Sequence, residues 1–368
     1  MRTEHVLIIR FSALGDVAMT VPVVSSVARQ YPDVRFTVLS RPGMKPLFEG
    51  IAPNIGFMGA DLEGEYRGLG GLRRLYHRLT AKQFTAVADL HDVLRSKLLR
   101  LCFNMERYKV AHIDKHRSGK RRLLKERPLT QQPSAFSNYA DVFARLGYPV
   151  KPEFKSVFAD KGTSSADYMP ENSAGRYKGD YERCHILGHG PNIGIAPFAA
   201  HEGKVYPLPL LEKVIRELIK LYPDSRLLLF GGGKREQEVM SQWCARYKQC
   251  VAAHNHAKGL RDELRLMSRL DVMLSMDSAN MHLASLTATP VVSVWGTTHP
   301  YAGFMGWGQS MDNAVQLELP CRPCSIYGNR PCRLGDTRCM NDIAPETIVE
   351  RMAKIVGQAH RGEPDKEG

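Results

Sequence analysis

A carboxylate stands in the turn after the first predicted strand. The stretch IIRFSALGDVAMTVPVV, residues 8–24, predicts an apolar strand, a polar turn Ser12-Ala13-Leu14-Gly15-Asp16 and a helix. In an open α/β sheet such a turn lies at the carboxyl end of a strand, where ligands bind. Asp16 is therefore a candidate for contact with a substrate. The alternative is that Asp16 only caps its own helix.

A second cluster of polar residues follows the predicted strand VMLSM, in Asp277-Ser278-Ala279-Asn280-Met281-His282. Asp277 is predicted to cap the next helix, whose N-terminal amides would then face a phosphate. The Ser278 hydroxyl is a further donor, and His282 lies one turn into the helix. The alternative is that Asp277 is only a cap and that His282 only packs in the core.

Three other predicted strands in the second half also end in polar turns. Lys204 follows NIGIA and could neutralise a leaving diphosphate. Gly231 and Gly232 follow LLLF. Without side chains they would let a nucleotide approach the backbone closely, or they only form a tight turn. Thr297 and Thr298 follow VVSVWG. Four polar strand ends together favour a nucleotide site over four unrelated turns.

The net charge of +13 is concentrated in one block. Residues 95–127 contain twelve Lys or Arg and three acids, a difference of +9. Such a block attracts a phosphorylated substrate, anionic lipid or nucleic acid, or is a solvated surface. Binding of single-stranded nucleic acid needs aromatic side chains for stacking. Phe103 and Tyr108 are the only aromatic residues of this kind in the block, so no nucleic-acid partner is expected.

Four of the eight cysteines cluster as Cys321-x2-Cys324-x7-Cys332-x6-Cys339. Four thiols at this spacing could hold zinc, although only the first couple is close-spaced. A metal-free loop is the other interpretation, and both stay open. No run of about 18 apolar residues and no signal-peptide pattern occur, so we expect a cytoplasmic protein.

Strand, turn and helix alternate in both halves of the chain, which predicts parallel, doubly wound sheets. We expect two Rossmann-like domains, 1–165 and 185–344, facing each other across a cleft. Residues 160–192 predict a linker or exposed insert. The helix at 345–360 is expected to pack back on the first domain.

Several known motifs are excluded. Gly188-His-Gly190-Pro-Asn-Ile-Gly194 has the letters of a dinucleotide fingerprint, but Gly194 lies inside a predicted strand. No Walker loop, no G-x-S-x-G elbow and no Asp-x-Asp occur. Because Asp-x-Asp is the usual sign of a metal-bound sugar nucleotide, its absence removes that sign, and we expect neither a metal nor a cofactor at the nucleotide site.

Together these stretches resemble the heptosyltransferases of lipopolysaccharide synthesis, glycosyltransferase family nine. The opening motif Ser-x-x-Gly-Asp, the segment DLHDVLRSKLL and the motif MDSANMHLASLTATPVVSVWGTTHP carry the resemblance. It implies the GT-B fold, two Rossmann-like domains, and an inverting transfer of heptose from ADP-heptose to a lipopolysaccharide core acceptor.

The resemblance also implies roles for single residues. Asp16 would be the general base, and Ser12, Gly15, His91 and Arg95 would bind the acceptor. The donor would be bound by Lys204, Gly231, Gly232, Asp277, Ser278, Ala279, His282, Thr297 and Thr298. The basic block would steer the anionic acceptor or contact the anionic inner membrane leaflet.

Three short segments depart from the family pattern. Ser278-Ala279 stand for Thr-Gly, His91-Asp92 for Gln-Gly, and Gly232-Gly233-Lys234 for Gly-Ala-Glu. These departures leave open a related transferase with another nucleotide sugar and acceptor. A nucleotide-sugar-binding protein without catalysis is the remaining alternative.

Overall fold

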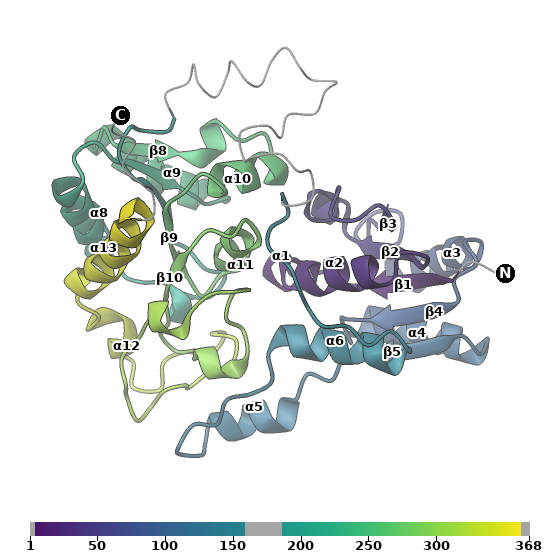
Figure 1. The fold of residues 1–368 in the computed structure, drawn as a ribbon. Coiled ribbons are helices and arrows are strands. Elements are labelled where there is room, and N and C mark those ends of the chain that lie inside the picture. The colour runs from purple at the N-terminus through teal and green to yellow at the C-terminus, as the bar shows by residue number, and fades with distance from the viewer. Residues whose placement is uncertain (1–3, 159–185, 362–368) are drawn as a thin grey trace, which may run out of the picture. The chain divides into compact units, whose positions relative to one another are not determined.

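The computed structural model describes residues 4–158 and 186–361 (Figure 1). The chain forms two compact units. Unit 1 comprises Met1–Arg117 and Gln132–Asp160, and unit 2 comprises Ser118–Gln131 and Lys161–Gly368. Cys184, most of the expected linker at 160–192 and the end of the C-terminal tail lie outside the described residues.

Unit 1 is built on a parallel sheet in the order β3-β2-β1-β4-β5. The strands are β1 (His5–Ile9), β2 (Arg35–Ser40), β3 (Ile55–Gly59), β4 (Ala86–Asp89) and β5 (Lys109–His112). β1 is central, between β2 and β4, and all of its residues are buried. This explains why its sequence is apolar without alternation, since a central parallel strand is covered on both faces.

Helices cover both faces of this sheet. They are α1 (Leu14–Ala18), α2 (Val21–Gln30), α3 (Gly68–Thr80), α4 (Leu94–Met105) and α6 (Ala135–Arg145), with the 3-10 segment η1 (Pro42–Leu47). Right-handed crossovers put α2 on one face and α3 and α4 on the other. The pairing of α2 with α6 and of α3 with α4 agrees with this arrangement.

Unit 2 contains a second parallel sheet, in the order β11-β10-β9-β6-β7-β8. Its strands are β6 (Asn192–Ala196), β7 (Arg226–Leu229), β8 (Cys250–Ala252), β9 (Val272–Met276), β10 (Val291–Val294) and β11 (Ala314–Val315). Two parallel, doubly wound α/β units confirm the predicted fold class.

The helices of unit 2 include the strongest amphipathic pattern of the sequence. They are α8 (Leu208–Leu221), α9 (Lys234–Arg246), α10 (Leu260–Met267), α11 (Ala279–Leu286), α12 (Arg338–Asn341) and α13 (Pro345–Arg361), with η4 (Glu202–Lys204), η5 (Ala253–Asn255), η6 (Pro300–Ala302) and η7 (Met311–Asn313). In α8 the residues Leu211, Val214, Ile215 and Leu218 are fully buried, as their three- and four-residue steps predict.

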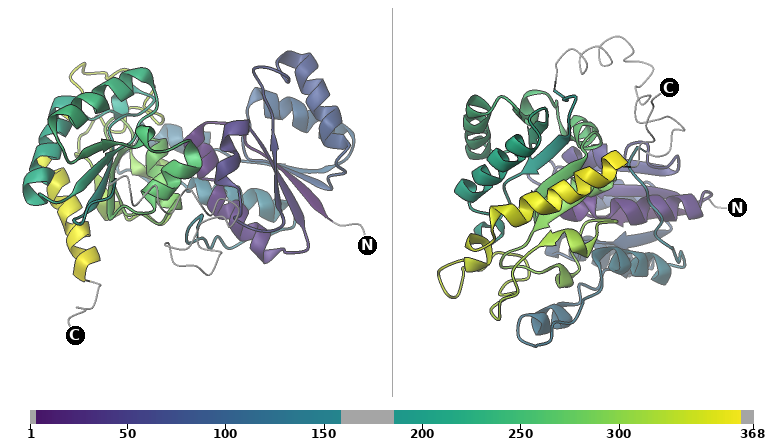
Figure 2. Two further views of the ribbon diagram at one scale, coloured as in Figure 1. Left: turned by 90° about the horizontal axis from the view of Figure 1, so that it is seen from above. Right: turned by 60° about the vertical axis from the view of Figure 1, so that its left-hand side comes forward.

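The C-terminal helix packs on unit 2, which corrects the expectation that it returns to the first domain. Ile348, Met352 and Val356 lie one helical turn apart and are buried in the core of unit 2. α13 contacts α8 and β9, and Figure 2 shows it (yellow) across the strands of that unit. The apolar face of α13 is therefore buried within unit 2.

Residues 118–131 correct a second expectation, because they leave unit 1 and join unit 2. The segment contains most of α5 (Arg117–Leu123). Leu123 packs with Ala302 and Ile326, and the Lys120 ammonium lies 4.1 Å from the ring centroid of Phe304. The basic block is thus divided between the two units rather than confined to the first.

Each sheet has a switch point, where neighbouring strands are followed by connections that run in opposite directions. In unit 1 it lies between β1 and β4, and in unit 2 between β6 and β9. Ligands of doubly wound sheets bind beyond the carboxyl ends of the strands at this place. The turns after these four strands contain Asp16, His91, Lys204 and Asp277 respectively.

Candidate functional site

Asp16 lies at the switch point of unit 1 and forms an ion pair with Arg10. Arg10 Nη2 is 2.7 Å from Asp16 Oδ2, and Arg10 Nη1 donates to the carbonyl of Leu90 at 2.7 Å. The Arg10 side chain is 6% exposed and that of Asp16 is 38% exposed. A guanidinium fixed by the end of β4 therefore holds a carboxylate that still reaches solvent.

The alternative interpretation of Asp16 as a helix cap is partly realised. Ala13, not Asp16, is the N-cap of α1, and Asp16 is the third helical residue. Its carboxylate accepts a hydrogen bond from the Ala13 amide at 3.3 Å. Ser12 and Gly15 are half-buried in the same turn. Helix capping thus uses the same carboxylate oxygen, Oδ2, as the ion pair.

His91 follows β4 and is buried beside the Asp16 turn. Its Nδ1 accepts a hydrogen bond from the Phe11 amide at 3.4 Å. Burial and the nearby charges of Arg10 and Lys115 lower the pKa of His91 to about 3. His91 is therefore a neutral imidazole at physiological pH, with Nε2 as the remaining donor.

Two more carboxylates complete this side of the sheet. Asp89 is fully buried and accepts from the His91 amide at 2.9 Å and from Arg100 Nη1 at 3.1 Å. Asp92 is 13% exposed and forms ion pairs with Lys97, Arg100 and Arg117. Of these acids, Asp16 is the exposed one.

Lys115 also lies near these acids, and sequence reasoning treated it only as part of the basic block, whereas it singled out Arg95. Lys115 is half-buried, and burial followed by the Arg10 charge lowers the pKa of its ammonium. Arg95 is exposed in the first turn of α4. Arg10 was missed altogether. Its signal was a lone charge at the end of an apolar strand, directly before the Asp16 turn.

The switch point of unit 2 contains a second ion pair. Lys204 Nζ lies 2.9 Å from Asp277 Oδ2, with the lysine side chain 16% and the aspartate 5% exposed. Thr298 Oγ1 donates to the same carboxylate oxygen at 2.8 Å. The structure therefore brings together Lys204, Asp277 and Thr298, three residues that sequence reasoning assigned to one donor site.

The turn that carries Lys204 is fixed by its neighbours. The amide and hydroxyl of Thr297 both donate to the Gly203 carbonyl, at 3.1 and 2.9 Å. The stem of Lys204 lies against Gly328, where an added Cβ would come within 2.6 Å of Lys204 Cγ. Thr297 and Gly328 thus set the direction of the lysine.

Asp277 is not the cap of the following helix, which corrects that prediction. Ser278 is the N-cap of α11, and its side chain makes no capping hydrogen bond. The Ser278 hydroxyl instead lies 3.2 Å from that of Ser275. The Asp277 carboxylate instead contacts Lys204 and Thr298 through Oδ2. Ala279 begins α11, and His282 is buried one turn later.

The glycine turn after β7 is hydrogen-bonded to a carboxylate of the next helix, which sequence reasoning did not place there. Glu236 Oε2 accepts from the Gly232 amide at 2.8 Å, and an added Cβ on Gly231 would lie 3.1 Å from the same oxygen. Glu236 is the third residue of α9 and closes its N-terminus. Position 234, where the family pattern has Glu, is Lys in this chain, and the nearest carboxylate in the sequence is that of Glu236, two residues later.

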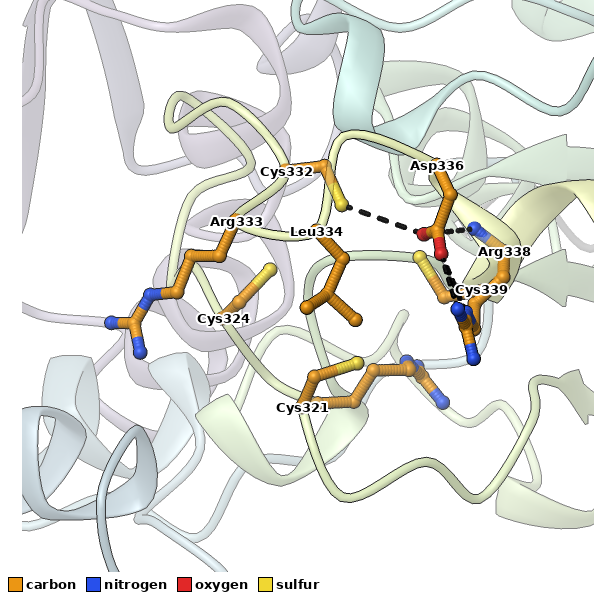
Figure 3. A pocket seen from close by; sticks show the side chains of 9 residues that line it. Cys321, Cys324, Cys332, Arg333, Leu334, Asp336, Arg338 and Cys339 are labelled. Atoms are coloured by element: carbon orange, nitrogen blue, oxygen red, sulfur yellow. Dashed lines mark hydrogen bonds and ion pairs between the residues drawn. The ribbon is translucent and has the colours of Figure 1, made fainter.

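The four clustered cysteines line one small cavity of about 10 Å³. Figure 3 shows their thiols around it, with the side chain of Leu334 among them. Burial raises the pKa of Cys324, and that of Cys339 to about 11, which keeps both thiols protonated. Within residues 4–158 and 186–361, no three His, Cys, Asp or Glu side chains are placed to hold a metal ion.

Comparison with known proteins identifies a family. The profile of "Glycosyltransferase family 9 (heptosyltransferase)" matches residues 72–333, more than two-thirds of the chain. Lipopolysaccharide core heptosyltransferase OpsX of Haemophilus influenzae is 22% identical over 96% of this chain and 97% of its own length.

Two further proteins are similar. Lipooligosaccharide heptosyltransferase 2 of Campylobacter jejuni is 27% identical over 50% of this chain, and the chain spans only 57% of that relative. The solved structure of ADP-heptose lipopolysaccharide heptosyltransferase II from E. coli superimposes with a TM-score of 0.68. That match has 17% identity and covers 97% of this chain and 99% of the other.

The structural likeness confirms the GT-B fold class, and the family profile confirms the predicted family. None of the described helices combines the length and hydropathy needed to span a membrane. With Asp16 at one switch point and the Lys204–Asp277 pair at the other, the chain belongs to glycosyltransferase family 9, the heptosyltransferases.

Proposed function

We propose that this protein transfers a heptose from ADP-heptose to a lipopolysaccharide core acceptor, with inversion and with Asp16 as general base. One observation carries the proposal. Of the three carboxylates at the switch point of unit 1, Asp89 is fully buried and Asp92 is surrounded by cations, whereas Asp16 is 38% exposed. A base must reach the hydroxyl whose proton it removes.

The acceptor hydroxyl oxygen attacks the anomeric carbon from the face opposite the diphosphate, and Asp16 takes the hydroxyl proton. The bond between the anomeric carbon and the diphosphate oxygen breaks, and its electron pair leaves with ADP. In this proposal Asp16 is the base for the acceptor hydroxyl, and Lys204 is the cation that meets the leaving diphosphate.

Unit 2 supplies the groups for the donor. Lys204 and the Ser278 hydroxyl would neutralise and bind the diphosphate, since a lysine ammonium acts on phosphate as a point charge. Asp277, Thr297 and Thr298 hold Lys204 in place. We propose that Ala279, His282, Gly231 and Gly232 border the nucleotide and sugar.

Unit 1 supplies the groups for the acceptor. We propose that Ser12, Gly15, neutral His91 and exposed Arg95 contact it, with Arg95 and Lys97 beside its anionic groups. The similar proteins named for lipopolysaccharide support a lipopolysaccharide acceptor.

The deciding experiment is Asp16→Asn, assayed with ADP-heptose and a lipopolysaccharide core acceptor. We expect kcat to fall about 10²–10⁴-fold, the usual contribution of a general base. Donor affinity, followed by thermal stabilisation, should not change. Asp141→Asn, an exposed carboxylate paired with Arg145 on α6, is the matched control.

Two results would contradict the proposal. Equal loss of turnover and donor affinity in Asp16→Asn would mean that this residue binds rather than catalyses. Stronger stabilisation by UDP-sugars than by ADP-heptose would indicate the related transferase with another donor. NMR of the product linkage tests inversion independently.

A further inference from the structure

The outer face of α4 carries an apolar stripe that is exposed in the part of the chain that the structure describes. Leu94, Leu101 and Met105 have exposed fractions of 74%, 56% and 76%. They are separated by seven and four residues, so they lie in one line along the helix. Leu98 lies on the same line and is half-buried. Exposed apolar residues scattered singly are ordinary, but a line of them on one helix face marks an interaction surface.

The stripe is not the packing face of the helix. α4 contacts the core of unit 1 through Leu99 and Phe103, which are 1% and 0% exposed. The Phe103 ring meets that of Tyr76 on α3 edge-on, at 5.0 Å between centroids. Leu69, in the first turn of the adjacent α3, is 74% exposed as well. Leu98 packs partly against that core, whereas Leu94, Leu101 and Met105 are exposed and are not among the side chains that form it.

Cations flank the stripe. The sequence of α4, LRSKLLRLCFNM, contains Arg95, Lys97 and Arg100 and no acidic residue. Arg95 and Lys97 are exposed and lie on either side of the Leu94–Met105 line, at 100° per residue. Arg73 and Arg74 are exposed on α3. An apolar face bordered by lysine and arginine is the pattern of a helix that lies in the interface of an anionic bilayer.

We propose that the outer face of α4 docks this protein on an anionic membrane surface. Leu94, Leu101 and Met105 would enter the boundary between headgroups and acyl chains, and Arg95 and Lys97 would contact lipid phosphates. This docking rests on the proposed function, because an enzyme that acts on a lipid-linked acceptor must contact the membrane that holds it.

The chain connects this surface directly to the acceptor side of the site. His91, Asp92 and Val93 lead from the end of β4 into the first turn of α4, where Leu94 and Arg95 lie. Docking by α4 would thus place the turn that contains His91 next to the headgroups, where the sugar of a lipid-linked acceptor begins.

The test is cosedimentation of the full chain with vesicles of phosphatidylglycerol and phosphatidylcholine, without donor or acceptor. We expect the triple variant Leu94→Gln, Leu101→Gln, Met105→Gln to bind at least about tenfold more weakly than wild type. The matched control is Leu221→Gln, an exposed leucine of α8 in unit 2 at 50% exposure. It should bind like wild type. Turnover of a water-soluble acceptor fragment and the melting temperature check that the triple variant is folded.

A charge variant keeps the test decisive if the triple variant does not fold. Arg95→Glu should weaken binding to these vesicles and should leave any binding to pure phosphatidylcholine unchanged. Asp16→Asn should bind vesicles like wild type, which separates this proposal from the choice of catalytic base.

The proposal is overturned if wild type does not sediment with anionic vesicles, or if the triple variant binds as strongly as Leu221→Gln. It is also overturned if the triple variant changes only the oligomeric state, because the stripe would then be covered by a second copy of the chain.

Discussion

The ion pairs at the two switch points are opposites. In unit 1 a buried guanidinium, Arg10, holds an exposed carboxylate, Asp16, with side chains 6% and 38% exposed. In unit 2 a buried carboxylate, Asp277, holds the more exposed ammonium of Lys204, at 5% and 16%. In each pair the buried partner is fixed by further hydrogen bonds, from Arg10 to the Leu90 carbonyl and from Thr298 to Asp277.

This contrast suggests how one type of fold serves two ligands. The more exposed member of each pair has the charge that its proposed ligand needs: negative for a hydroxyl proton, positive for a diphosphate. The buried member sets direction and lowers the freedom of a side chain that would otherwise explore several rotamers. Each ion pair can be broken by replacing its buried or its exposed residue, and the effects on rate and on donor affinity should differ between the two pairs.

The largest effect in this comparison is expected from the buried side of the first pair. Arg10→Met removes the guanidinium that orients Asp16, and a displacement of about 1 Å can cost on the order of 10²-fold in rate. We expect kcat to fall by about that factor and donor affinity to stay unchanged. Arg10→Lys should recover part of the rate. An Arg10→Met enzyme with wild-type kcat would show that Asp16 does not need this partner.

Breaking the second pair should act on the donor instead. Lys204→Met would remove the proposed charged contact to the diphosphate, worth about 1.5–3 kcal/mol, or roughly 10–100-fold in affinity. It also leaves Asp277 buried without its cation, so the melting temperature should fall. Calorimetric titration with ADP measures the affinity directly. If ADP affinity stays at the wild-type value, Lys204 is only a structural partner of Asp277.

A smaller effect should follow from moving Lys204 without removing its charge. Gly328 has φ +76° and leaves no room for a Cβ beside the Lys204 stem, whereas Gly335 in the same loop has φ +74° and open space. Gly328→Ala and Gly335→Ala should each lose about 1 kcal/mol or more from the left-handed backbone, and Gly328→Ala should lose more because its Cβ meets the Lys204 stem. Only Gly328→Ala should also weaken ADP binding, by several-fold. Equal ADP affinity in the two variants would contradict this role of Gly328.

The smallest effect concerns pH. Burial and neighbouring cations lower the pKa of His91 to about 3 from 6.5. The unfolded chain then binds more protons than the folded one between these values, so stability falls as pH decreases from about 6.5 toward 3. The slope is at most about 1.4 kcal/mol per pH unit for one group.

His91→Gln should reduce this acid sensitivity in urea unfolding between pH 7 and 5 and change little above pH 7. His299 in unit 2, with its pKa lowered to about 4 by burial and by Arg322, makes a parallel contribution that remains in the variant. An unaltered pH dependence in His91→Gln would mean that His91 is not the group that titrates.

Local patterns predicted much of the fold because they report local physics. Apolar runs such as HVLII form buried parallel strands, and the three- and four-residue steps in residues 208–221 form α8. The four polar turns in the second half do follow β6, β7, β9 and β10. The cap of α11 was misassigned, because Asp277 and Ser278 are both good caps and only a distant lysine decides between them.

The sequence by itself determined the fold class, the family and the strand ends where polar residues lie, since these depend on periodicity and on short motifs. Tertiary structure alone decided which charges pair, that residues 118–131 and α13 belong to unit 2, and that α4 keeps an apolar line exposed. The physical reason is distance along the chain. Lys204 and Asp277 are 73 positions apart in sequence but 2.9 Å apart in space. Such contacts arise from the packing of whole sheets, and no periodic pattern in the intervening sequence predicts them.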